Sequence, residues 1–300
     1  MNTRLRRTLL GLTAVATGMG MFTTAADAAV PPPEVPQAPV SGYTYVSKAS
    51  GHDSSRTHSV VARCPAGRVA LGGGVRIVEG ENRVLLRGSY PQRHGWVAVA
   101  QELEPRGAGS GTGAAWHVVA YAVCAKAPAG LTYVARTSAR TSENSRTKQA
   151  VCPTGRRLLG LGGRITHADF KAGINSVTVD TTLVKSATVR GSKARPTGAR
   201  WSVTAYAVCT DPRGQTLHES FWKPVADGTR SGAASASCPR GTRAFGAGVR
   251  LYGNAGVLNR LALLELRPTV RPPAARARVS ELGSGLAATW YLKAQAVCAR

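Results

Sequence analysis

Three glycine-rich stretches each end on an arginine, a composition that could suit a loop that cradles phosphate. They are CPAGRVALGGGVR at 64–76, CPTGRRLLGLGGR at 152–164 and CPRGTRAFGAGVR at 238–250, with the common pattern C-P-x-G-x-x-x-x-G-x-G-x-R. A Walker-type loop needs Gly-Lys and then Ser or Thr at the start of a helix, because the lysine reaches the phosphates and the hydroxyl reaches the metal. None of the three stretches has this, and none has the recurring acidic residue of a dinucleotide fold. The sequence therefore does not predict a nucleotide site.

Alternation within these stretches instead predicts a β-strand with one bare face. Counted from each cysteine, the odd positions carry apolar residues that we expect to face the core: Leu71, Val75, Ile77, Leu159, Leu161, Ile165, Phe245, Val249 and Leu251. The even positions carry two glycines and then Arg76, Arg164 or Arg250. Glycine inside a strand marks a bulge or the close approach of another chain segment or a ligand. We expect a neighbouring strand or an aromatic ring over the glycines. The alternative is a ligand groove bordered by the three arginines, which are the candidate binding residues.

Residue types that carry catalysis form no recognisable constellation. The sequence has no G-x-S-x-G, no H-E-x-x-H and no metal-spaced Cys/His cluster, and its six histidines fall at no repeated position. Glu102 and Glu104 could imitate a glycosidase pair, but those carboxyls must lie across the scissile bond, at least about 5 Å apart. We expect these two residues to end a strand at the surface. The sequence predicts no enzyme, no metal site and no cofactor.

A second motif follows each glycine-rich stretch and shows that the chain is built of repeats. It reads WHVVAYAVC up to Cys124, WSVTAYAVC up to Cys209 and WYLKAQAVC up to Cys298. Self-similarity at this spacing indicates three copies of one structural unit. One face of the motif is kept and the other varies, so we expect Trp116, Trp201 and Trp290 to be core residues rather than platforms for sugars.

The third copy departs from the other two. It has Gln295 where the others have Tyr121 and Tyr206. Tyr45 and Tyr133 both stand nineteen residues before the first cysteine of their repeat, and we expect Glu219 to take that place in the third.

Short strand patterns, frequent Gly and Pro, and no helical periodicity indicate an all-β protein with five or six strands in each repeat. We predict three homologous, disulfide-stapled repeats of the β-sandwich type, at 43–129, 130–213 and 214–300. The alternative is a single pseudo-three-fold assembly of the β-prism type.

Six cysteines predict three disulfides in an exported protein. We expect pairs within repeats, because a repeat with its own staple can fold alone: Cys64 with Cys124, Cys152 with Cys209, and Cys238 with Cys298. The symmetric alternative joins Cys124 to Cys152, Cys209 to Cys238, and Cys64 to Cys298.

Residues 1–28 have the pattern of an export signal. Arg4, Arg6 and Arg7 precede a fourteen-residue apolar stretch, and Ala26-Asp27-Ala28 supplies a cleavage site. That stretch is shorter than the roughly 20 residues that cross a bilayer. We expect no membrane span, and a monomeric extracellular protein cleaved near Ala28 and exported by the general route, with the twin-arginine route as the alternative. A proline-rich linker would follow at 29–42.

The chain is strongly basic, which points to anionic partners. It has 39 Lys and Arg against 15 Asp and Glu, a net charge of +24, and removal of the signal leaves 36 against 14, or +22. Such an excess attracts polyanions. We expect a non-enzymatic binding or surface-associated protein for anionic cell-wall polymer or polysaccharide, with non-specific nucleic-acid binding as a further possibility. The alternatives are a structural or matrix protein and a secreted hydrolase inhibitor.

The paired C-P-x-G…G-x-G and Y-A-V-C motifs resemble a repeat of uncharacterised secreted proteins from high-GC Gram-positive bacteria and of some phage tail proteins. The resemblance covers nearly all of 43–300 and implies no particular activity.

Overall fold

The chain forms β-strands in the same order in each repeat, as the computed structural model shows for residues 39–103 and 113–300. The predicted signal peptide, residues 29–38 of the predicted linker, and Glu104 lie outside the described residues. The first repeat forms β1 (Thr44–Ala49), β2 (Thr57–Arg63), β3 (Val69–Val78), β4 (Val84–Gln92), β5 (Gly95–Glu102) and β6 (His117–Ala125). The second forms β7 (Thr132–Thr137), β8 (Ser145–Val151), β9 (Arg157–Thr166), β10 (Ala172–Val179), β11 (Ser186–Lys193) and β12 (Ser202–Thr210). The third forms β13 (Thr216–Glu219), β14 (Lys223–Val225), β15 (Ser231–Ser237), β16 (Arg243–Tyr252), a short helix α1 (Ala255–Leu258), β17 (Leu261–Val270), β18 (Pro273–Glu281) and β19 (Trp290–Ala299). The predicted all-β fold is confirmed.

Each repeat folds into two layers with a shared core. In the first repeat, β1, β6 and β3 are hydrogen-bonded neighbours, and so are β2, β5 and β4. Ala62 of β2 and Trp96 of β5 pack in the same buried cluster as Ala120 of β6, so the two layers face each other. The disulfide Cys64–Cys124 joins the end of β2 to β6. A sandwich-like repeat stapled across its layers therefore matches the expectation.

All three predicted disulfides are confirmed. Cys152–Cys209 and Cys238–Cys298 repeat the connection of the first pair, at sequence separations of 57 and 60 residues. Disulfides of this kind are typical of an oxidising, extracellular environment.

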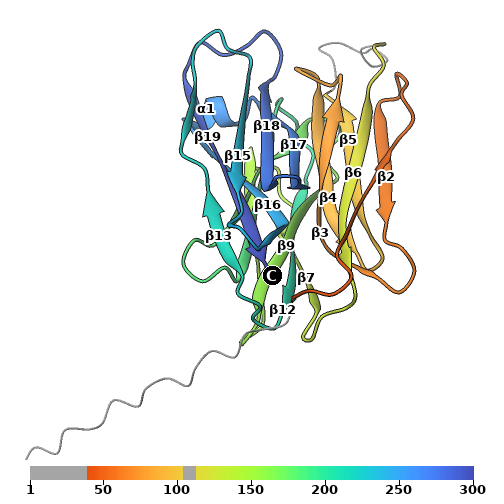
Figure 1. Cartoon of the computed structure of the whole chain (residues 1–300). Helices are drawn as coiled ribbons and strands as arrows, with labels where there is room; N and C mark the ends of the chain where they lie inside the picture. Colours follow the sequence, from red (N-terminus) through yellow and green to blue (C-terminus); the bar gives the residue numbers. More distant parts are fainter. Residues whose placement is uncertain (1–38, 104–112) are drawn as a thin grey trace, which may run out of the picture. The chain divides into compact units, whose positions relative to one another are not determined.

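The layers continue from one repeat into the next. One sheet has the order β1-β6-β3-β17-β18-β15, a second β2-β5-β4-β9-β12-β7, and a third β13-β19-β16-β10-β11-β8. Figure 1 shows β17 and β18 in blue beside the orange β3. Each repeat thus shares one sheet with each of the other two, which closes a ring. The repeats are sandwich-like in their layers, and their sheets join as in the alternative pseudo-three-fold assembly.

The three glycine-rich strands meet at the centre of this ring. Leu71, Leu159 and Phe245 occupy the same position in their repeats and pack together in one small buried cluster. A β-bulge lies at this position in each copy, because the strand register skips one residue there. The simple alternation had placed Leu71 on one face with Val75. That part of the prediction is wrong, because the bulge moves Leu71 into the central cluster while Val75 stays in the large core.

The bare face of these strands is covered by backbone from other repeats. A Cβ on Gly72 would lie 1.9 Å from the carbonyl oxygen of Phe245, and one on Gly160 would lie 2.3 Å from that of Leu71. These distances are too short for any side chain, so only glycine fits. The expectation of a neighbouring strand over the glycines is confirmed.

Two further expectations are corrected. Glu102, expected at the surface, has an exposed fraction of 0% at the end of β5. The third-repeat counterpart of Tyr45 is Leu217 rather than Glu219, because Tyr45 pairs with Val123 and Leu217 with Val297, each the residue before a disulfide cysteine. The third repeat is longer here, so counting back from its cysteine misplaced the strand.

Candidate functional site

The three candidate arginines lie on three different sheets. Each is at or beside the point where strands of two repeats pair, which we call a seam. In the strand register, Arg76 lies opposite Glu265 where β3 meets β17, and Arg164 lies opposite Gly88 where β9 meets β4. Arg250 follows Val249, which is the point of pairing between β16 and β10. The fold therefore separates the three arginines, and their surroundings must be compared one seam at a time.

At the β3–β17 seam, a carboxylate accompanies the positive charge. Arg267 Nε donates to Glu265 Oε1 at 2.7 Å, and its guanidinium lies 4.6 Å from the centre of the Tyr121 ring. Tyr121 in turn stacks on Tyr45, with ring centroids 5.7 Å apart. The outer face of this seam is thus a paired and stacked network.

Beside the β16–β10 seam, on the neighbouring strands β19 and β13, acid and base are again paired. Lys293 Nζ lies 3.2 Å from Glu219 Oε2, and Gln295 Nε2 donates to Glu219 Oε1 at 2.7 Å. Burial acts to raise the pKa of Glu219, but these contacts and the charge of Arg250 outweigh it and hold that pKa below its usual value. Gln295 also accepts from the backbone N of Val179, which joins the two repeats.

The β4–β9 seam differs, because it has a hollow lined by two arginines. We call it the seam pocket, and it is an open cavity of about 370 Å³. Its lining includes Arg87, Tyr90, Gln101, Arg164, His167 and Phe170. It combines side chains of the first repeat with side chains of the second, so it exists only where the two repeats join.

Arg87 is held in place in this pocket by neutral oxygens. Its Nη2 donates to the carbonyl oxygen of Ile165 at 3.2 Å, and its Nη1 donates to Gln101 Oε1. Burial and then the nearby charge of Arg164 lower the pKa of Arg87, while Asp169 opposes them. Two like charges are therefore close enough to disfavour each other, and a bound anion would relieve that repulsion.

Aromatic rings surround the two arginines. The Arg164 guanidinium lies 5.5 Å from the centre of the Tyr90 ring, and Tyr90 stacks on Tyr206 with centroids 5.2 Å apart. On the other side, the guanidinium of Arg56 lies 4.2 Å from the centre of the Phe170 ring. Within the described residues, Arg56 Nε and Nη2 are buried without a hydrogen-bond partner.

This arrangement is suited to binding an anionic group. Guanidinium groups form strong, directional hydrogen bonds to carboxylate and phosphate oxygens. Within residues 39–103 and 113–300, neither Arg87 nor Arg164 forms an ion pair, in contrast to the paired cations of the other two seams. The seam pocket is therefore the candidate site, and Arg164 is the one predicted arginine that belongs to it.

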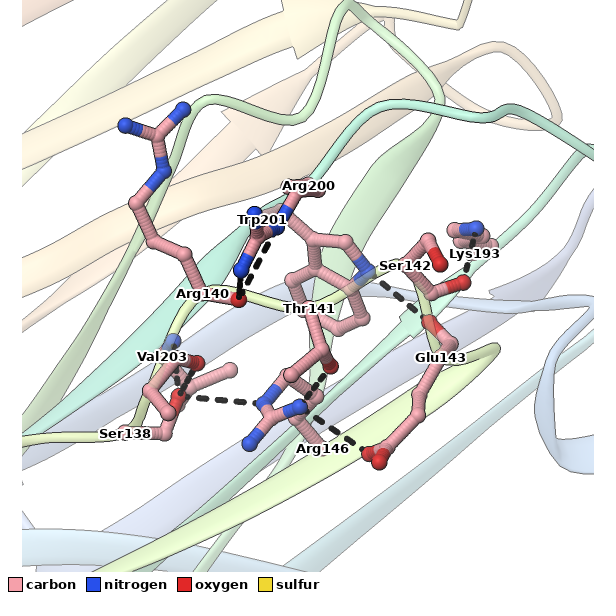
Figure 2. A network of polar contacts seen from close by, with 11 residues as sticks. Ser138, Arg140, Thr141, Ser142, Glu143, Arg146, Lys193, Arg200, Trp201 and Val203 are labelled. Atoms are coloured by element: carbon pink, nitrogen blue, oxygen red, sulfur yellow. Dashed lines mark hydrogen bonds and ion pairs between the residues drawn. The ribbon is translucent and has the colours of Figure 1, made fainter.

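The three tryptophans that recur in the repeats are core residues, as predicted. Trp116, Trp201 and Trp290 each have an exposed fraction of 0%. Figure 2 shows how polar contacts hold residues 138–143 around Trp201, whose Nε1 donates to the carbonyl oxygen of Glu143 at 2.9 Å. Lys193 Nζ donates to the carbonyl oxygen of Ser142 at 2.6 Å.

Arg146 completes this network. It lies between Ser138, which accepts from its Nε at 3.1 Å, and Glu143, whose carboxylate is 3.0 Å from its Nη1. The polar side chains of this cluster form hydrogen bonds with one another and with the backbone. The network therefore holds residues 138–143 in place over Trp201.

Sequence reasoning missed most of the seam pocket and also a group of exposed aromatic residues. Arg87 and Phe170 lie outside the repeated motifs, and only the pairing of β4 with β9 brings them together. The aromatic residues are Phe221, Trp222, Tyr252 and Tyr291 of the third repeat. A comparison of the three copies would have singled out the two tyrosines, which stand where other copies have smaller or polar residues.

No model of a known protein family matches this sequence, and no curated protein matches it. The resemblance to secreted repeat proteins therefore stays a prediction. No helix among the described residues is long and apolar enough to cross a membrane. In the same part of the chain, no group of three or more His, Cys, Asp or Glu side chains could hold a metal ion.

Proposed function

We propose that this is a secreted, non-enzymatic protein that binds an anionic cell-wall polymer or acidic polysaccharide through the seam pocket. The observation that carries the proposal is the adjacency of Arg87 and Arg164 in an open hollow, with neutral hydrogen-bond partners and aromatic walls. Phosphate or carboxylate groups of a polymer would bind the two guanidinium groups, and sugar rings would contact Tyr90 and Phe170.

The charge of the whole chain supports this proposal. The net charge of +22 that remains after removal of the expected signal raises the local concentration of polyanions around the protein and speeds their encounter. Three disulfides are typical of an oxidising, extracellular environment, in agreement with the export signal expected at 1–28.

Co-sedimentation with purified cell walls, with and without their anionic polymers, tests the proposal. The protein should pellet at low salt with intact walls and much less with stripped walls. The double variant Arg87→Gln/Arg164→Gln should lose at least about tenfold in affinity, because a hydrogen bond to a charged group is worth about 1.5–3 kcal/mol. The control Arg271→Gln/Arg276→Gln removes the same charge from exposed positions and should lose less.

Two results would reject wall binding at this pocket. The first is wild-type protein that stays in the supernatant with intact walls, which would favour a matrix protein or a hydrolase inhibitor. The second is an equal loss in the two double variants, which would indicate attraction by net charge alone. Thermal unfolding of Arg87→Gln/Arg164→Gln checks that the β4–β9 seam is intact.

A further inference from the structure

Four aromatic side chains gather on the outside of the third repeat. Phe221 is 96% exposed, Tyr252 is 66% exposed, Trp222 is 42% exposed and Tyr291 is half-buried. The ring centroids of Trp222 and Tyr252 are 6.3 Å apart, and those of Tyr252 and Tyr291 are 5.9 Å apart. We call these four residues the aromatic strip. It reaches from the β13–β14 edge to β19 and β16, which are neighbouring strands of one sheet.

The strip begins at an extra residue in the edge strand. Glu219 of β13 pairs with Gln295, and Lys223 of β14 pairs with Leu292. The edge strand therefore advances four positions, 219 to 223, while β19 advances three, 292 to 295. The other two repeats have the same extra residue, because Ala49 pairs with Val119 and Asp53 with Trp116, and Thr137 pairs with Thr204 and Thr141 with Trp201. The third repeat differs in the residues at this point: Phe221 and Trp222 stand where the first repeat has Gly51 and His52 and the second has Ala139 and Arg140. The extra residue interrupts the edge strand and places Phe221 and Trp222 opposite Lys293.

The rest of the strip is also special to the third repeat. Tyr252 pairs with Tyr291 across β16 and β19. The same cross-strand pair is Val78 with His117 in the first repeat and Thr166 with Ser202 in the second. The second repeat forms the same strands without aromatic rings at these positions, and the first has only the imidazoles of His52 and His117 there, so the fold does not require the large aromatic side chains.

The strip combines apolar faces with a polar border. Lys293 Nζ lies 5.0 Å from the centre of the Trp222 ring and pairs with Glu219. Trp222 and Tyr252 are inclined by 62°, and Tyr252 and Tyr291 by 58°, so the rings do not form one flat plane. Exposed apolar patches of this kind mark binding sites on soluble proteins. The ring angles suit a single, twisting chain better than a flat crystalline surface.

We propose that the aromatic strip binds a neutral polysaccharide chain by stacking its sugar rings on Trp222 and Tyr252. A sugar ring presents an apolar face of C–H groups within a rim of hydroxyls. The aromatic faces of the strip would contact the C–H groups of the sugar. The tyrosine hydroxyls, Lys293 and Glu219 would form hydrogen bonds with its hydroxyls.

The observations favour this occupant over two others. A second copy of the chain would have to approach against its own net charge, which is +22 without the expected signal. A bilayer would have to desolvate the ion pair of Lys293 and Glu219 together with the tyrosine hydroxyls, which is costly.

This inference goes beyond the proposed function. The strip lies on the sheet of β19 and β16, whereas the seam pocket lies on the sheet of β4 and β9. Binding at the strip depends on ring stacking, and binding at the pocket depends on charge. An experiment can therefore reject one of the two proposals without rejecting the other.

Retention on insoluble polysaccharides in 1 M NaCl tests the strip, because the Debye length of about 3 Å at this ionic strength screens the arginine pocket. The probes are amorphous chitin, amorphous cellulose and peptidoglycan freed of anionic polymers, whose chains are not fixed in a flat crystal face. We expect retention of the wild-type protein on at least one of them. Trp222→Ala/Tyr252→Thr should reduce that retention at least about tenfold, with threonine taken from the equivalent position 166. The control Val151→Ala/Leu183→Ala changes exposed apolar residues elsewhere and should bind like wild type.

Four outcomes would overturn the proposal. They are no retention of the wild-type protein on any probe, equal retention by the strip variant and the wild type, strip-dependent binding to anionic lipid vesicles instead of polysaccharide, and a dimer in sedimentation that the strip variant abolishes. Both changed residues of the strip are exposed, and an unaltered melting temperature shows that the variant is folded.

Discussion

The α-carbon of Gly72 faces the carbonyl oxygen of Phe245, so closely that a Cβ at position 72 would lie 1.9 Å from that oxygen. The two residues belong to different repeats, and their contact is one of three such approaches around the central cluster. The glycines of the repeated motif therefore join the repeats to one another.

Replacement of Gly72 by alanine should destabilise the whole protein. The new methyl group would overlap backbone, which cannot move aside as a flexible side chain can. Overpacking of a core usually lowers the free energy of unfolding by about 1–3 kcal/mol. The loss from a backbone clash this close should be at or above the top of that range. Chemical denaturation measures the loss. Gly198→Ala is the control, since its Cβ would meet nothing within 4 Å, and a loss in that variant equal to that of Gly72→Ala would contradict the argument.

Loss of one disulfide should weaken all three repeats together. Cys152→Ala/Cys209→Ala opens a loop of 57 residues, worth about 4 kcal/mol in the chain-entropy model. Each repeat shares a sheet with both of the others, so unfolding of the second repeat would leave unpaired edges on its neighbours. Calorimetry should show one transition at a lower temperature. A second transition that stays at the wild-type temperature would show that the repeats unfold independently.

Much of this architecture follows from the sequence because the repeated motifs carry it. Cysteines of two alternating types predict the pairing, and the kept face of Trp116, Trp201 and Trp290 predicts a core. The joining of sheets across repeats could not be decided, because the repeat pattern does not say whether the edge of β3 pairs within its own repeat or with β17. The bulge at Leu71 was missed for a related reason, since one extra residue breaks the alternation without changing the motif.

The candidate site was less predictable, because it depends on contacts between residues that are far apart in the chain. Arg164 stood out through its repetition, but the same repetition suggested that Arg76 and Arg250 were equivalent to it. Their difference comes from the partner strand. Glu265 lies opposite Arg76, whereas Gly88, which carries no charge and is covered by the Tyr90 ring, lies opposite Arg164.

Stability should fall in strong alkali because of buried tyrosines. Burial raises the pKa of Tyr43 to about 12, although the charge of Arg243 opposes this shift. Tyr43 also donates to the carbonyl oxygen of Ala244 at 3.1 Å. Below the unfolded pKa of about 10 the phenol is neutral in both states, and its full contribution is present. Between pH 10 and 12 the unfolded state loses the proton first, so the free energy of unfolding falls, by about 3 kcal/mol at most.

The variant Tyr43→Phe isolates this effect. It keeps the ring that meets Phe245 edge to face, with centroids 5.3 Å apart, but has no proton to lose. Denaturation at a series of pH values from 9 to 11.5 should show a shallower decline in the variant than in the wild type. Parallel curves would mean that Tyr43 does not titrate with folding.

The three repeat-equivalent arginines provide matched tests of one another. Arg76→Gln, Arg164→Gln and Arg250→Gln each remove one positive charge from the same position of the motif, so an effect of net charge must be equal in all three. We expect Arg164→Gln alone to weaken retention on anionic polymer at least about threefold more than the others, because only Arg164 lines the seam pocket with Arg87. Arg76 stands opposite Glu265, and the charge of Arg250 acts on Glu219, so neither faces a second arginine in a hollow. Retention on immobilised polyanion across a salt series provides the measurement, with melting temperatures as the check on folding. Equal losses of retention in the three variants would indicate that the recurring arginine has a structural role in all three repeats. They would also show that the seam pocket gives Arg164 no special part in binding.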